Sequence, residues 1–107
     1  MLDDILQNLR SYLPDTDFER VKRAAEYADA KHEGQKRKSG EPYVVHPFGV
    51  AKTITELRLD EPSVCAALLH DCIEDTSATD DEVAELFGED VQFLVDGVTK
   101  LDNLRLN

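Results

Sequence analysis

The sequence contains no tryptophan, and aromatic residues make up only 7% of its 107 positions. The core must therefore rest on leucine, valine, isoleucine and alanine, which suits one small globular domain with 41% hydrophobic and 33% charged residues. No apolar run approaches the roughly 18–20 residues that a membrane span needs. The opening stretch MLDDILQNLR carries acids where a secretory signal would carry positive charge. We expect a cytoplasmic protein that does not associate with membranes.

Cysteine is equally scarce, with two residues in the chain. Cys65 and Cys72 are expected on one helix, which would place their Cα atoms about 10 Å apart by helical rise. A disulfide requires a Cα separation below about 7 Å. We therefore expect two buried thiols in a reducing compartment.

Basic residues are outnumbered by acidic ones, 12 against 23, giving a net charge of −11. Such a surface repels the nucleic-acid backbone, so we expect no nucleic-acid partner. Against this background the run KHEGQKRKSG, residues 31–40, is locally basic. It is either a solvated loop, as most charge runs are, or a small anion-binding site, and composition alone does not decide.

Hydrophobic residues recur at three- and four-residue spacing along nearly the whole chain, and no segment alternates as a strand would. We therefore predict an all-α bundle of about five or six short helices. The first spans residues 2–13, and Asp15, Thr16 or Asp17 can cap the second, which runs to about residue 32. Proline or glycine marks the ends of the predicted helices, at Pro14, Gly34 and Gly88.

The loop over residues 34–46 is long for so small a domain, and long ordered loops are often functional. Helices are predicted to begin near Pro47 and Pro62, and Thr79 with Glu82 forms a capping-box pattern for another. The residues expected to face the core in the later helices are Val50, Ile54, Leu57, Val64, Ala67, Leu68, Val83, Leu86, Phe87, Val91, Leu94 and Val98.

The stretch AALLHDCIED places His70, Asp71, Glu74 and Asp75 together at the end of an apolar helix. Residues three and four apart share a helix face, so these groups are expected on one patch. Acids at a helix C-terminus oppose its dipole and repel one another, and a cation among them would relieve both penalties. Histidine with aspartate suits a divalent first-row metal such as Mn²⁺, Fe²⁺ or Zn²⁺. An ion pair or a chance surface cluster is the alternative interpretation.

The other two histidines can be interpreted in two ways. His46, in YVVHP, lies just before the expected helix start and is suited to pointing inward, although a lone histidine there is more often structural. His32 continues the apolar stripe of the second helix, which favours a core or supporting role.

Three motifs in order, RKSGEPYVVHP, LLHDCIEDT and FGEDVQFLVDGVTKL, resemble the N-terminal HD hydrolase domain of the Rel/SpoT alarmone enzymes. The resemblance covers essentially the whole chain. It implies an HD-domain helical bundle that hydrolyses the 3′-pyrophosphate of the guanine nucleotides ppGpp and pppGpp, giving GDP or GTP and pyrophosphate. It further implies that the longer parent enzyme is bifunctional, with GTP pyrophosphokinase activity.

The resemblance also implies roles for single residues. His46, His70 and Asp71 match three ligands of one Mn²⁺ ion. Glu74 and Asp75 match a pair that orients or activates the attacking water. The implied nucleotide-binding residues are Arg37, which packs on the guanine base, and its neighbours Lys38 and Ser39.

One departure from the family pattern concerns the fourth metal ligand, an aspartate in an ADRLHN-like motif that this chain lacks. Asp96 and Asp102 precede the helix that carries it and are not assigned as ligands. We therefore expect residues 1–107 to form a single, incomplete HD-type phosphohydrolase domain, truncated at its C-terminus. Such a piece is expected to bind metal weakly, to hydrolyse little, and to self-associate through the apolar surface that truncation exposes.

Two other functions remain open. One is an HD-type phosphohydrolase that acts on another nucleotide, which would keep the His-Asp pair without needing the RKSGEPY loop. The other is a non-catalytic helical regulatory module in which these residues form only a polar cluster.

Overall fold

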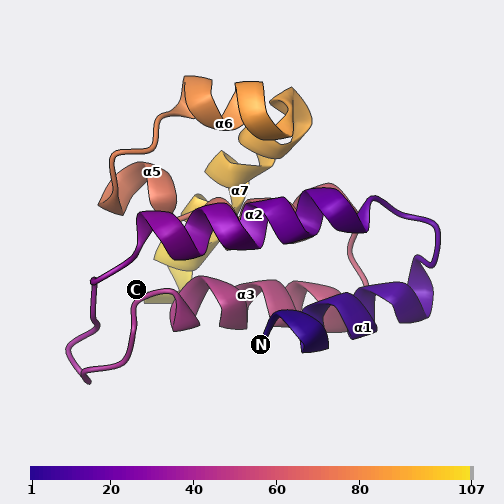
Figure 1. The fold of residues 1–107 in the computed structure, drawn as a ribbon, viewed down its shortest axis with the longest axis horizontal. Coiled ribbons are helices and arrows are strands. Elements are labelled where there is room, and N and C mark those ends of the chain that lie inside the picture. Colours follow the sequence, from indigo (N-terminus) through magenta and orange to yellow (C-terminus); the bar gives the residue numbers. More distant parts are fainter. Residues whose placement is uncertain (107) are drawn as a thin grey trace.

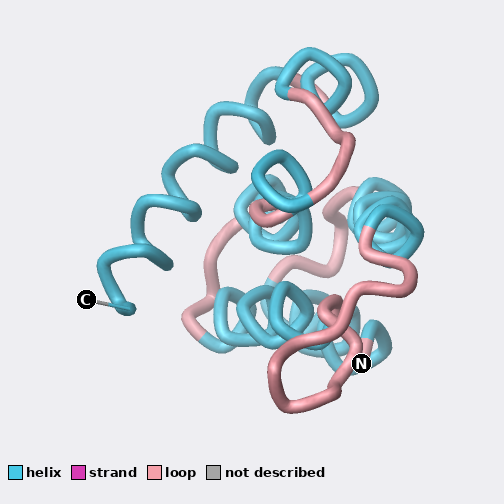
Figure 2. Tube along the Cα trace, turned by 90° about the vertical axis from the view of Figure 1, so that its left-hand side faces the viewer, coloured by secondary structure: helices cyan, strands magenta, loops and turns pink. Residues whose placement is uncertain are grey.

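The structure is a computed structural model that describes the backbone of residues 1–106 and the side chains of residues 1–100. Helices and connecting loops make up this part of the chain, and Figure 2 contains no strand. The predicted all-α fold is confirmed. The helical segments are α1 (Leu2–Tyr12), α2 (Phe18–Lys31), α3 (Val45–Glu56), α4 (Glu61–Leu69), the single turn α5 (Cys72–Asp75), α6 (Asp80–Phe87) and α7 (Glu89–Leu106).

Side-chain caps fix several of these helix boundaries. Asp17 accepts a hydrogen bond from the Arg20 amide at 3.0 Å and caps α2, which settles the choice among three predicted capping residues. Thr79 accepts from the Glu82 amide at 3.1 Å and caps α6. Gly88 ends α6 with φ of 105°, a conformation that favours glycine. Local sequence therefore determines where these two helices begin.

Helix α4 lies at the centre of the bundle and packs against α2, α3 and α7. In Figure 1, α1 and α3 lie at the bottom, α2 crosses the middle and α6 lies at the top. Seven of the nine residues of α4 are buried, so the helix has no solvent face. Its C-terminal end therefore delivers the residues that follow, His70 and Asp71, into the interior of the protein.

Two residues expected in the core are exposed instead. Leu57 is 64% exposed and Leu86 is 46% exposed. Helix α3 begins at Val45, two residues before Pro47, and its fully buried face is formed by Pro47, Ala51 and Thr55. Leu57 caps the end of this helix and falls outside that face.

Both cysteines are buried free thiols, as predicted. Burial, aided by the hydrogen bond from Cys65 to Glu61, raises the pKa of the Cys65 thiol well above its usual value. Burial and the nearby Asp71 carboxylate raise the pKa of Cys72 to about 12. Both side chains therefore remain protonated at neutral pH. Among the described residues, no helix is both long and apolar enough to cross a bilayer.

Arg20 joins α2 to α4 and to the junction between α6 and α7. Its guanidinium donates to both oxygens of Glu61, at 2.6 and 2.8 Å, and to the Phe87 carbonyl at 3.0 Å. The Asp90 carboxylate completes the cluster, with its Oδ2 atom 3.2 Å from Nη2 of Arg20. Hydrogen bonding to Glu61 is the main cause that raises the pKa of Arg20. Since the Glu61 side chain is only 6% exposed, Arg20 is the counter-ion that compensates for the burial of its carboxylate.

We expect Arg20→Ala to lower the free energy of unfolding by about 2–4 kcal/mol, because it leaves a buried carboxylate without its counter-ion. Urea denaturation followed by circular dichroism measures the change. Lys22→Ala is the matched control, since Lys22 pairs with Glu19 at 3.3 Å on the surface and should contribute less than about 0.5 kcal/mol. Equal losses of unfolding free energy in the two variants would show that the buried cluster stabilises the fold no more than a surface ion pair does.

Candidate metal centre

His46 lies in the first turn of α3, not just before the helix as the sequence suggested. The chain already turns ahead of it, because the amides of Val45 and His46 donate to the carbonyls of Pro42 and Tyr43 at 3.2 and 3.1 Å. Pro47 is tolerated because an amide this early in a helix has no carbonyl partner to lose. The His46 side chain is 25% exposed, so it lies at the edge of the interior.

His70 and Asp71 lie in a turn between α4 and α5, which corrects the expectation of one continuous helix. The carbonyl of His70 accepts a hydrogen bond from the Thr99 hydroxyl of α7 at 3.2 Å. This contact with a helix 29 residues away accompanies the interruption of the helix at this point. The turn leaves His70 fully buried and Asp71 only 7% exposed.

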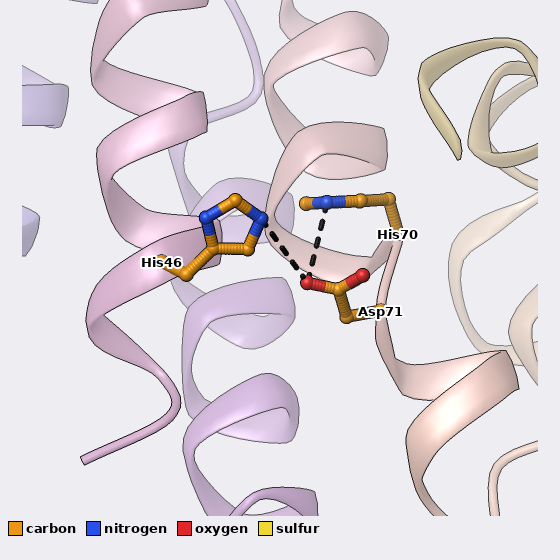
Figure 3. Close-up of side chains that lie close together, drawn as sticks. All are labelled: His46, His70 and Asp71. Atoms are coloured by element: carbon orange, nitrogen blue, oxygen red, sulfur yellow. Dashed lines mark ion pairs between the residues drawn. The ribbon is translucent and has the colours of Figure 1, made fainter. Parts of the chain in front are cut away.

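These three side chains converge, as Figure 3 shows. The Oδ2 atom of Asp71 lies 3.5 Å from Nε2 of His46 and 3.3 Å from Nε2 of His70. The two imidazole rings are 5.5 Å apart between centroids and inclined at 63°. One potential ligand atom from each residue lies within 4.8 Å of the others.

A hydrogen bond fixes which nitrogen of His70 faces the cluster. Nδ1 lies 2.6 Å from the carbonyl of Ala67, and a carbonyl can only accept, so Nδ1 carries the proton. In the neutral ring Nε2 then holds a lone pair directed at Asp71. Metal-binding histidines are oriented in the same way by a second hydrogen bond from the other nitrogen.

The donor set fits a divalent metal ion. Atoms bound to one ion at about 2.0–2.2 Å lie about 3–4.4 Å from one another, and both distances from Asp71 fall in that range. Two imidazoles and one carboxylate also match the ligand preference of first-row divalent metals.

Glu74 and Asp75 lie outside this three-residue group. Both are exposed on α5, the single turn that follows the break. The Tyr43 hydroxyl donates to the Asp75 carboxylate at 2.9 Å, and the Tyr43 ring lies 6.5 Å from that of His46. Asp75 is thus connected to the cluster through a residue that sequence patterns did not indicate.

The pKa of Tyr43 is raised well above its usual value. The largest cause is burial, followed by the hydrogen bond to Asp75 and the charge of Asp71. The hydroxyl therefore remains a hydrogen-bond donor at any physiological pH.

The predicted nucleotide-binding loop is only partly brought to the cluster. Arg37 lines a cavity of about 280 Å³ together with Val45, His46, Gly49, Val50 and Thr53. Lys38 and Ser39 are exposed at the tip of a turn in which the Gly40 amide donates to the Arg37 carbonyl at 2.8 Å. Neither lines that cavity. Of the aspartates considered as further ligands, Asp96 is exposed on α7 and Asp102 lies outside the residues with described side chains.

Comparison with known proteins identifies the family of this chain. The HD-domain family matches residues 24–107, which include all three clustered residues. The chain belongs to the HD-domain family. An HD domain implies a divalent metal ion, and the group of His46, His70 and Asp71 is a possible site for one.

Within that family the chain is homologous to the Rel/SpoT enzymes. It is 58% identical over 90 residues to a GTP pyrophosphokinase of Myxococcus xanthus, covering 84% of this chain and 12% of the relative. It is 46% identical over 105 residues to the bifunctional (p)ppGpp synthase/hydrolase SpoT of Escherichia coli strain K12, covering 98% and 15%. The chain therefore spans only a small fraction of the length of these relatives.

A solved structure supports the same relationship. It is described as a metazoan ortholog of SpoT that hydrolyses ppGpp, and it matches with a TM-score of 0.67 and 41% identity. The match covers 75% of this chain and 47% of that one. The all-α fold and the Rel/SpoT resemblance are therefore both confirmed.

Proposed function

We propose that this HD domain hydrolyses the 3′-pyrophosphate of ppGpp and pppGpp, releasing GDP or GTP and pyrophosphate, with one Mn²⁺ ion as cofactor. The observation that carries the proposal is the convergence of His46, His70 and Asp71 beside a cavity that Arg37 lines. The names of the homologous enzymes and of the solved structure supply the substrate class. We further propose that residues 1–107 act as one HD-type unit, and that the full-length protein containing this sequence also has GTP pyrophosphokinase activity.

In this proposal His46, His70 and Asp71 hold the ion through the nitrogen and oxygen atoms that already face one another. When bound, such an ion polarises phosphoryl oxygens and makes water a stronger nucleophile near neutral pH. Glu74 and Asp75 orient the attacking water, and one of these two carboxylates accepts the single proton that the water loses, a transfer that needs a separation of about 2.6–3.2 Å. Their exposure leaves them accessible to water and to substrate.

Arg37 supplies the contact with the base. A guanidinium plane stacks on a purine and fixes its position with few hydrogen bonds. Its place at the cavity beside His46 would set the base next to the proposed metal ligands. Lys38 and Ser39, at the exposed tip of the same turn, would meet phosphate oxygens. The self-association expected from the sequence stays a prediction.

The test measures nucleotide hydrolysis by the full-length protein containing this sequence, with ppGpp, a deoxynucleoside triphosphate and a cyclic dinucleotide offered separately. We expect activity on ppGpp that EDTA removes and Mn²⁺ restores. Arg37→Ala should lower kcat/KM for ppGpp about 10-fold or more, the scale of losing one stacking contact. Lys52→Ala, which removes an exposed charge from α3, is the control and should leave the rate unchanged.

Each alternative function has its own outcome in this assay. Cleavage of another nucleotide, with ppGpp turnover indifferent to Arg37→Ala, would favour an HD phosphohydrolase of different specificity. Protein that purifies without metal and shows no turnover that responds to EDTA would favour a non-catalytic regulatory module. Either result would contradict the alarmone hydrolase.

A further inference from the structure

The carboxylate of Asp75 is held in place by the loop that precedes α3, from outside its own helix. The Tyr43 hydroxyl donates to Oδ2 of Asp75 at 2.9 Å. The side-chain amide of Gln35 donates to the backbone carbonyl of Asp75, also at 2.9 Å. Both the charged group and the backbone of Asp75 are therefore tied to the segment of residues 35–43. A single-turn helix such as α5 needs this support, because so short a helix is not stable on its own.

The two supporting residues are tied to each other. The amide of Tyr43 donates to the backbone carbonyl of Gln35 at 2.9 Å, so the two ends of the loop meet. The Tyr43 ring also stacks on that of His32, with centroids 5.0 Å apart and planes inclined at 22°. Since His32 is only 2% exposed, it provides a rigid surface for the tyrosine. The ring of Tyr43 therefore has little freedom to turn.

Hydrogen-bond chemistry gives this network one consistent arrangement. Nε2 of Gln35 donates to the Asp75 carbonyl, so Oε1 of Gln35 must be the acceptor for Nδ1 of His32, at 3.1 Å. That assigns the proton to Nδ1 of His32 and leaves Nε2 as an acceptor, 3.7 Å from the sulfur of Cys72. The thiol, which stays protonated, donates there. In this hydrogen-bonded series, which runs from the Cys72 thiol through His32 and Gln35 to the Asp75 carbonyl, each donor therefore faces an acceptor.

The network ends at the metal centre. Besides holding Asp75, Tyr43 places its ring edge-on to His46, at 6.5 Å and 76°. One residue therefore bridges a proposed metal ligand and a proposed proton acceptor. For proton transfer, orienting the acceptor is as important as having it nearby.

We propose that Tyr43 is a positioning residue: its hydroxyl orients the Asp75 carboxylate toward the cluster of His46, His70 and Asp71, while its stacking on His32 fixes the tyrosine. This inference rests on the proposed role of Asp75. Tyr43 acts through Asp75 and takes no part in holding the ion.

The decisive change is Tyr43→Phe, which removes one oxygen and keeps the ring that stacks on His32. In the full-length protein we expect kcat for ppGpp to fall about 10-fold or more, within the range of roughly 10- to 100-fold for losing a supporting hydrogen bond. KM and the affinity for Mn²⁺ should change less than about 2-fold, because neither the base site nor the ligands are altered. In metal-free protein, hydrogen exchange measured by mass spectrometry should become faster in α5.

Tyr27→Phe is the matched control. The Tyr27 hydroxyl donates to the carboxylate of Glu82, the same pairing of groups at a distance from the cluster. This variant loses an equivalent bond, and it should keep kcat and the exchange rate of α5. A fall in kcat as large as that of Tyr43→Phe would assign the effect to general loss of stability and would overturn the proposal.

A double-mutant cycle separates positioning from structural support. With Asp75→Asn already in place, adding Tyr43→Phe should lower kcat by less than about 2-fold, because the residue it orients is gone. Full additivity of the two losses would overturn the proposal, as would an unchanged kcat for Tyr43→Phe alone. In both cases loss of activity in Asp71→Asn would show that the proposed hydrolysis stands. Wild-type activity in both Asp71→Asn and Asp75→Asn would overturn the two proposals together.

Discussion

Replacing His70 by alanine is expected to abolish hydrolysis of ppGpp and to weaken Mn²⁺ binding on the order of 10²-fold or more. Residues that only hydrogen-bond to a metal ligand contribute up to about that factor, and His70 is proposed as a ligand itself. The side chain is fully buried and its tautomer is set by the Ala67 carbonyl. Metal titration by calorimetry, with hydrolysis assayed in parallel, measures both effects.

Because His70→Ala also opens a space in the core, two further variants keep the result interpretable. His46→Ala removes a partly exposed proposed ligand, and Asp71→Asn preserves the shape of the side chain, so both variants should lose metal while keeping helical circular dichroism. His32→Gln removes the third histidine of the chain and should still bind Mn²⁺. Tight binding of Mn²⁺ by both His46→Ala and Asp71→Asn would show that the ion is held elsewhere.

Glu74→Gln is expected to lower kcat by roughly 10²-fold or more while leaving Mn²⁺ bound, the usual effect of losing a group that accepts a proton in the reaction. The substitution changes charge with almost no change in volume. Since Glu74 is exposed on α5 and outside the ligand group, neither folding nor metal binding should depend on it. Steady-state kinetics together with metal analysis of the purified variant separates the two effects.

The matched control is Glu85→Gln, because Glu85 is an exposed glutamate on α6. It should keep the wild-type rate. A Glu74→Gln enzyme that turns over within about 3-fold of wild type would assign the proton to another group, Asp75 first, by the scale of general base effects. Loss of Mn²⁺ from this variant would instead indicate that Glu74 helps to hold the ion.

Local rules were sufficient for most of the helices. Spacing and caps correctly placed α1, α2 and α6, because each has an apolar stripe and a terminator within its own sequence. The wrong predictions concern which residues are buried, because packing between helices determines this. Leu57 and Leu86 continue apolar patterns but face solvent, while Val95, only 2% exposed, was missed on α7. Which face of a helix is buried depends on its neighbours, and those are not visible in a short window.

The site shows the same division. The sequence identified His46, His70 and Asp71 as candidates, and the structure brings them together. The sequence did not reveal the turn at His70 and Asp71, where the hydroxyl of Thr99, on another helix, donates to the His70 carbonyl. The pairing of Tyr43 with Asp75 joins residues 32 positions apart, and no spacing rule indicates such a contact. Contacts of this kind arise only from the way the helices pack.

The most direct measurement is the anomalous diffraction of Mn²⁺ in crystals of this protein, collected at the manganese absorption edge. The proposal predicts one strong peak about 2.0–2.3 Å from Nε2 of His46, Nε2 of His70 and a carboxylate oxygen of Asp71. A well-ordered protein with no peak among these three atoms, or with its manganese bound at another place, would contradict it.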